Sequence, residues 1–299
     1  MKKQLFLLLL LFWGINLFAQ NYPSGSLLWK ISGNELKEPS YLLGTFHLKS
    51  GDFLDSIPGA IVALDNVQQI VGEINMGNMQ ELQMQIAPAM MMSSDTTYQA
   101  LYTTEDFDYV SECLVLYLGA GLEQMSMLKP AAIQNVIVIM AYLKNMPGFN
   151  PENAMDAFIQ KKAILDGKPV VALETVESQI DVLFGSSLQR QADLLLCYLR
   201  NGDEIVANEI TKLIEDYNNG NLNTIYMDSF QNEDTPCPPT PLEKDILLKN
   251  RNDQWMEKLP ELMKEKSSFI AVGALHLAGE EGLLNQLQQS GYIVEPIFK

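Results

Sequence analysis

The chain has 299 residues, of which 47% are hydrophobic, enough to bury a sizeable core in one α/β unit with insertions. Its formal net charge of −17 at pH 7 means that its surface repels nucleic acid and anionic membranes. Composition therefore argues against a nucleic-acid-binding protein and favours an acidic globular one.

Residues 1–19 have the pattern of a secretory signal peptide. Lys2 and Lys3 precede an apolar run shorter than the ~20 residues that span a bilayer, and Ala19 is a small residue suited to cleavage. A membrane anchor is the alternative interpretation. We expect an exported protein, periplasmic or secreted, that keeps no stable membrane span and whose residues 20–299 form a single domain.

Six apolar runs predict strands. The runs in "SLLWKISG" and "SYLLGTFHL" flank a turn-rich segment, which is typical of a hairpin. Further strands are expected at residues 67–74, 168–174, 267–276 and 291–298. Because these runs alternate with helical patterns, we expect an α/β fold with a mostly parallel central sheet and helices on both faces.

The first of two helical insertions is expected at about residues 76–166. Thr104 is a plausible N-cap, and Pro130 and Pro151 suit first helical turns. The methionine-rich segment 76–92 allows two interpretations. Thioethers can bind a soft metal or a flexible partner, but methionine commonly fills uneven helical cores, and we expect it to line a core or a groove.

The second insertion is expected at about residues 177–265. It reads as three or four helices broken at Gly185, Gly202 and Gly220, followed by a last long helix that contains Arg251 and Asn252.

The three cysteines cannot all pair within one chain. Cys113 and Cys197 lie in apolar helical patterns typical of small buried side chains, whereas Cys237 lies in "TPCPPTP" and is expected to be exposed. No disulfide is needed to explain the expected fold.

Four predicted strands each end in a residue that is costly to bury: His47, Glu73, Glu174 and His276. The histidines are the only two in the chain, and each is the last residue of a Gly-x-x-His motif. Ligands bind beyond the carboxyl ends of parallel strands, so we expect the four side chains to converge. The glycines, lacking a Cβ, let another backbone or a ligand come close.

This set of side chains suggests metal-assisted hydrolysis. Two imidazoles and a carboxylate, His47, His276 and Glu73, can hold a divalent ion with a water in the open position. Glu174 could act as general acid or base, and Arg251 could bind a carboxylate or an oxyanion. The competing interpretation of each residue is structural, as a hydrogen-bonded histidine, a helix-end carboxylate or a surface ion pair.

The motifs resemble the TraB/GumN family, which includes the Tiki-type proteases. The resemblance rests on both Gly-x-x-His motifs and on "VGEIN", "LKP", "MDAFIQKKA" with Asp156, "PVVALETVESQ" and "KNRNDQWMEKL", in this order. It implies a fold related to erythromycin esterase and the haem-binding ChaN proteins. It also implies divalent-metal peptidase activity that requires His47, Glu73 and His276.

The resemblance further matches Glu174, Arg251 and Asn252 to family positions, and we expect these residues to serve catalysis, with Asn252 orienting the substrate. The sequence thus predicts an exported hydrolase that uses Mn, Co or Zn to act on a peptide or a small amide or ester. The alternatives are a metal-independent, esterase-like hydrolase and a non-catalytic protein that binds a peptide or haem.

Overall fold

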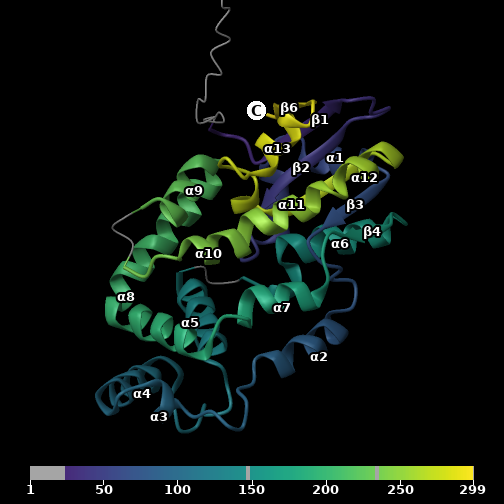
Figure 1. Cartoon of the computed structure of the whole chain (residues 1–299). Helices are drawn as coiled ribbons and strands as arrows, with labels where there is room; N and C mark the ends of the chain where they lie inside the picture. Colours follow the sequence, from purple (N-terminus) through teal and green to yellow (C-terminus); the bar gives the residue numbers. More distant parts are fainter. Residues whose placement is uncertain (1–23, 146–148, 233–235, 299) are drawn as a thin grey trace, which may run out of the picture.

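A six-stranded sheet lies at the centre of the computed structural model, which describes residues 24–145, 149–232 and 236–298 (Figure 1). The strand order is β4-β3-β5-β2-β1-β6. Strands β4, β3, β5 and β2 are parallel, whereas β1 is antiparallel to both β2 and β6. The strands are β1 Leu28–Gly33, β2 Ser40–Thr45, β3 Gln69–Gly72, β4 Val170–Ala172, β5 Ser268–Gly273 and β6 Tyr292–Pro296. The predicted α/β fold with a mostly parallel sheet is confirmed.

The central strands are apolar because helices cover both faces of the sheet. Ile70 and Val71 of β3 and Phe269 and Ile270 of β5 are fully buried. Each predicted strand is present, but the strands are shorter than the predicted ranges, and the fifth differs at the end that matters for the site. It ends at Gly273, and a 3₁₀ turn, η4 (Ala274–His276), follows it.

Two helical insertions separate β3 from β4 and β4 from β5. Helices η1 Gly51–Ser56 and α1 Ala60–Asn66 lie between β2 and β3. The first insertion contains α2 Met79–Ala89, α3 Tyr98–Leu101, α4 Thr104–Leu118, α5 Pro130–Asn145, η2 Pro151–Asn153 and α6 Met155–Leu165. The second contains α7 Val176–Phe184, α8 Leu188–Asn218, α9 Leu222–Phe230, α10 Pro241–Lys244, the π-helical turn η3 Asp245–Lys249, α11 Asn250–Met256 and α12 Leu259–Glu265, and α13 Leu283–Gln289 follows β5.

Three details of the predicted helices are wrong. Thr103, rather than Thr104, caps α4, because its side chain accepts the N–H of Asp106. Pro151 lies in the 3₁₀ turn η2, and α6 begins four residues later. Helix α8 continues through Gly202, since one glycine costs only about 1 kcal/mol in a helix of 31 residues that also packs against α5. The breaks at Gly185 and Gly220 are confirmed.

The core has two parts. The larger cluster surrounds the sheet and includes Trp29, Trp255 and Phe269. The smaller one lies among α3, α4, α5 and α8, away from the sheet (Figure 1), and includes Leu114 and Leu195. Among the described helices, none is both long enough and apolar enough to cross a bilayer. The expected signal peptide lies outside the described residues.

The methionine-rich segment has a divided role. Met92 is buried in the smaller core, and Met76 lines a cavity described below. Met79, Met84 and Met91 are exposed. Core and groove lining therefore account for only part of this segment.

A disulfide joins Cys197 of α8 to Cys237, with a Cα–Cα distance of 6.1 Å, and Cys113 is free. The sequence patterns around Cys197 and Cys237 did not predict this bond. The proline-rich segment around Cys237 folds back along α8, which brings together two cysteines that are 40 residues apart in sequence.

We predict that removing this disulfide destabilises the protein. Closing a loop of 40 residues limits the unfolded chain, so Cys197→Ser with Cys237→Ser should lower the free energy of unfolding by up to about 4 kcal/mol. Urea unfolding with and without dithiothreitol measures the effect. The control, Cys113→Ser, should keep the sensitivity to reductant. The prediction would be contradicted if the wild type had the same unfolding midpoint with and without dithiothreitol.

Candidate active site

Three of the four polar strand-end residues surround one glycine. A Cβ placed on Gly273 would lie 3.3 Å from Glu73 Oε1, 3.7 Å from His47 Nε2 and 3.7 Å from His276 Cδ2. This follows from the sheet, because β5 lies between β3 and β2 and all three are parallel. The glycine of the second Gly-x-x-His motif leaves room for these side chains. The glycine of the first, Gly44, allows close approach instead, since its Cβ would lie 3.1 Å from Ala274 Cα.

Arg251 of α11 connects this cluster to the fourth residue, Glu174. Its Nε donates to Glu174 Oε2 (3.1 Å), and its Nη2 donates to Glu174 Oε1 (2.5 Å) and Glu73 Oε2 (2.6 Å). Its Nη1 donates to His276 Nε2 (2.8 Å) and to the Leu247 carbonyl oxygen (3.3 Å). A guanidinium has five N–H groups, and here each has an acceptor. Arg251 therefore has no free donor for a substrate in this arrangement.

Arg251 also fixes the tautomer of His276. Since a guanidinium only donates, His276 Nε2 must be the accepting nitrogen, and Nδ1–H donates to Asn252 Oδ1 at 2.7 Å. The Trp255 ring packs against the imidazole with a centroid distance of 4.4 Å. Burial lowers the pKa of His276 to about 3, with the Arg251 charge acting in the same direction and Glu73 opposing it. The ring is thus neutral at neutral pH.

Asn252 lies behind His276 rather than in a cavity wall. It is almost completely buried, and its amide Nδ2 donates to the carbonyl oxygens of Glu281 (2.8 Å) and His276 (3.2 Å). The geometry shows Asn252 holding His276. Its expected contact with substrate stays a prediction.

His47 is held by Asp156 of α6. The Nδ1 atom of His47 lies 2.8 Å from Asp156 Oδ2, and Asp156 Oδ1 accepts the Thr45 hydroxyl at 2.7 Å. The Asp156 carboxylate raises the pKa of His47, against an opposing contribution from desolvation. Because 62% of the imidazole is accessible, Nε2 can meet a ligand from solvent.

Glu73 is the most heavily bonded carboxylate of the cluster. Besides Arg251, it accepts the Gly273 amide at Oε1 (2.7 Å) and the Gln179 amide at Oε2 (3.0 Å). Burial opposes its ionisation, but the positive charges of His47 and Arg251 and the hydrogen bond from the Gly273 amide more than offset this and bring the pKa of Glu73 to about 2. Glu73 is therefore ionised in the folded protein.

Glu174 lies behind Arg251. Both of its oxygens accept N–H groups of Arg251, and its side chain is only 4% exposed. It does not appear among the residues that line the two cavities described next. The expected role of Glu174 in proton transfer stays a prediction, whereas its contact with Arg251 is plain.

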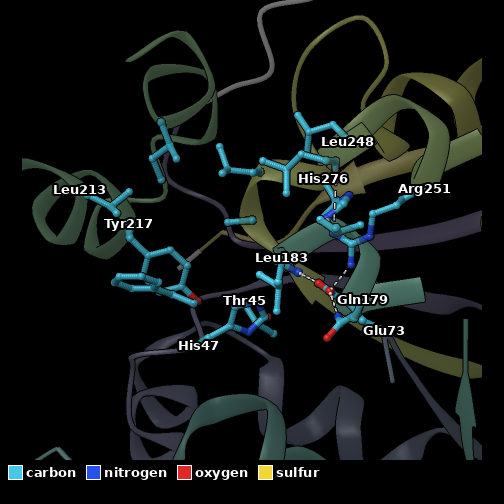
Figure 2. A pocket seen from close by; sticks show the side chains of 17 residues that line it. Thr45, His47, Glu73, Gln179, Leu183, Leu213, Tyr217, Leu248, Arg251 and His276 are labelled. Carbon is cyan, nitrogen blue, oxygen red and sulfur yellow. Dashed lines mark hydrogen bonds and ion pairs between the residues drawn. The ribbon is translucent and has the colours of Figure 1, made fainter. Parts of the chain in front are cut away.

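Two cavities meet at this cluster. The larger, of about 380 Å³, contains His276 and Arg251 in its wall, and Figure 2 shows them opposite Leu213 and Tyr217. The smaller, of about 200 Å³, lies on the Asp156 side. His47, Glu73 and Gln179 line both. A ligand that fills both cavities would therefore pass directly over His47 and Glu73.

Comparison with known proteins settles the family. A profile of the TraB/PrgY/gumN family matches residues 27–296. The chain belongs to this family. It is also 26% identical to the uncharacterized protein YbaP of Shigella flexneri over 261 residues, which are 83% of this chain and 88% of that protein. No solved structure matches the chain significantly. The TraB/GumN resemblance predicted from the motifs is confirmed.

Two residues that contact the cluster in this TraB/PrgY/GumN family member were not predicted as site residues from the sequence. Asp156 served only as a motif landmark, although its position in the first turn of α6 places it beside His47. Gln179 likewise closes the motif "PVVALETVESQ" but was given no role, because it lies in the amphipathic helix α7. Among the described residues, no three His, Cys, Asp or Glu side chains form a preassembled metal site.

We predict that the stability of the metal-free protein falls between pH 6.5 and 5 because of His276. The unfolded chain takes up a proton near pH 6.5, whereas folded His276 does so only near pH 3, so stability is present above 6.5 and is lost as pH falls. His47 has its pKa raised to about 9, so folded His47 is protonated throughout this window and its own contribution to stability rises only slightly as pH falls. The expected loss is about 1–2 kcal/mol, measured by urea unfolding in EDTA.

The matched variants are His276→Asn and His47→Gln. The first should remove most of this dependence on pH, because no other histidine of the chain has a lowered pKa. The second should keep it. Equal slopes in the wild type and His276→Asn would show that His276 is not buried in its neutral form.

Proposed function

We propose that this TraB/PrgY/GumN family member is a metal-dependent hydrolase that cuts an amide or ester bond where its two cavities meet. One observation carries the proposal: His47, Glu73 and His276 lie around a single point beside Gly273, on the floor of a cavity of about 380 Å³. Two imidazoles and a carboxylate at an open cavity are a donor set suited to hydrolysis.

The outer contacts of both histidines fit metal ligation. Each has its Nδ1 atom bonded to an oxygen, from Asp156 for His47 and from Asn252 for His276, which leaves Nε2 as the coordinating atom. Such contacts orient the imidazoles of metal sites and raise their basicity. His47, Glu73 and His276 would hold Mn, Co or Zn, and the bound ion would polarise a carbonyl and lower the pKa of a water. The Arg251 N–H that now occupies His276 Nε2 would have to move away.

We assign Arg251 to the carbonyl oxygen of the substrate. Glu174 binds its Nε and Nη2 atoms together, so the planar guanidinium and the Glu174 carboxylate would move as one unit when Nη1 leaves His276. The released N–H then becomes the free donor that Arg251 lacks in the present arrangement. In this account Glu174 positions Arg251, and Asn252 positions His276.

A metal-independent hydrolase is the second candidate, and the position of Arg251 favours it. The guanidinium already neutralises Glu73 and bonds to the lone pair that a metal would need on His276. His47 with Asp156 then forms an imidazole–carboxylate pair that acts as a general base once the imidazole, whose pKa Asp156 raises, has lost its proton, with its Nε2 facing the cavity.

We further propose that the protein is exported. The basic and apolar pattern of residues 1–19 supports this, as does the disulfide between Cys197 and Cys237, since disulfides persist mainly in oxidising compartments.

We predict that metal binding depends on both histidines. Wild-type protein equilibrated with Mn²⁺, Co²⁺ or Zn²⁺ and then desalted should retain about one ion per chain, because three ligands make a specific site. The double variant His47→Ala, His276→Ala should retain almost none. Glu295→Gln, a change at an exposed carboxylate of β6, is the control and should match the wild type. Equal metal content in all three proteins would remove the metal-dependent proposal.

Hydrolysis of a library of internally quenched peptides separates the two candidates. Under the metal-dependent mechanism, chelation and His47→Ala should each abolish cleavage, and added metal should rescue only the chelated wild type. Cleavage that survives complete chelation but is lost in His47→Ala selects the metal-independent mechanism. Cleavage that survives both treatments would place the reaction at another site.

A further inference from the structure

The larger cavity is apolar away from its polar floor. Helices α7, α8 and α9 and the turn η3 surround it with hydrophobic side chains (Figure 2), which include Leu183, Leu213, Ile225, Leu247 and Leu248. Its volume of about 380 Å³ lies within the range of about 300–1,000 Å³ typical of ligand sites. The walls can therefore accept a group larger than the bond that is cut.

The charges at the floor disfavour a free carboxylate in this cavity while no metal ion is bound. Arg251 is the only lysine or arginine in the described walls, and all five of its N–H groups have acceptors. His47 is paired with Asp156. In the metal-free protein three carboxylates, Glu73 in the wall, Glu174 behind Arg251 and Asp156 beside His47, outnumber these two cations, so an added anion would meet net repulsion.

The smaller cavity has a different character. Its volume is about 200 Å³, and polar groups of Gln160, Gln179 and Asp156 share its walls with apolar ones. The Gln160 amide already has hydrogen-bond partners within the protein. Its Nε2 donates to the Ile74 carbonyl oxygen and its Oε1 accepts the Met76 N–H, at 2.8 Å each. This side therefore suits a small group rather than a bulky one.

We propose that the substrate is an uncharged peptide segment with a large apolar side chain, such as Phe or Leu, in the larger cavity. A small residue on the other side of the bond that is cut occupies the smaller cavity. This assignment rests on the proposed function for the position of that bond. Removing an apolar side chain of this size from water contributes about 1.5–3 kcal/mol, which corresponds to roughly 10- to 100-fold in affinity.

Leu183 of α7 allows the assignment to be tested without disrupting the core. It lines the larger cavity, yet 47% of its surface is exposed, so Leu183→Glu places a charge in the cavity of a folded protein. Leu116→Glu on α4 is the matched control, since Leu116 is 86% exposed and lines neither cavity. The thermal unfolding midpoints of both variants should stay close to that of the wild type.

The probes are two pentapeptides, acetylated and amidated at their ends, that differ only in a central Phe or Ser. Calorimetry should show at least 10-fold tighter binding of the Phe peptide to the wild type. Leu183→Glu should lower the affinity for the Phe peptide at least 10-fold and leave the affinity for the Ser peptide unchanged. Leu116→Glu should bind both peptides as the wild type does. Three results would overturn the inference. They are equal affinities of the wild type for the two peptides, no binding of either peptide, and tighter binding of dodecanoate than of the Phe peptide.

Mass spectrometry of the same samples separates this inference from the proposed function. Binding that prefers Phe without cleavage keeps the inference and removes the hydrolase. Cleavage without any preference for Phe keeps the hydrolase and removes the inference.

Discussion

The site depends on the hydrogen bonds and ion pairs of one buried guanidinium, that of Arg251. Arg251 is 9% exposed and ties together Glu73, Glu174 and His276, which follow three different strands. Removing one partner of a buried ion pair costs about 3–5 kcal/mol, so these side chains are held as a unit. Arg251 therefore stabilises the fold and at the same time occupies the lone pair of His276 that a metal would need.

The two helical insertions supply what the sheet lacks. The strands alone bring His47, Glu73 and His276 together beside Gly273. The first insertion contributes Asp156, which orients His47, and the second contributes Arg251 and the apolar walls of the larger cavity. The sheet thus positions the reactive groups, while the insertions set their protonation and the shape of the space above them.

The sequence predicted the parts of the molecule that follow from local patterns. Apolar runs located every strand, and the rule for parallel strands brought the strand-end residues to one edge. Contacts between helices and distant strand ends were not predictable, because the motifs that contain Asp156 and Gln179 do not indicate that these side chains meet His47 and Glu73. The disulfide was missed for the same reason, since the pairing of Cys197 with Cys237 depends on how a proline-rich segment folds back on α8. Sequence also placed Arg251 near the site but could not show that all its donors are used.

The most direct test is a crystal structure of the protein soaked in Mn²⁺, with anomalous scattering to locate the ion. We predict one peak bonded to His47 Nε2, His276 Nε2 and the Glu73 carboxylate, with Arg251 Nη1 withdrawn from His276 and Glu174 still paired to the guanidinium. A fully soaked crystal with no peak at this position, and Arg251 Nη1 still bonded to His276, would contradict the account.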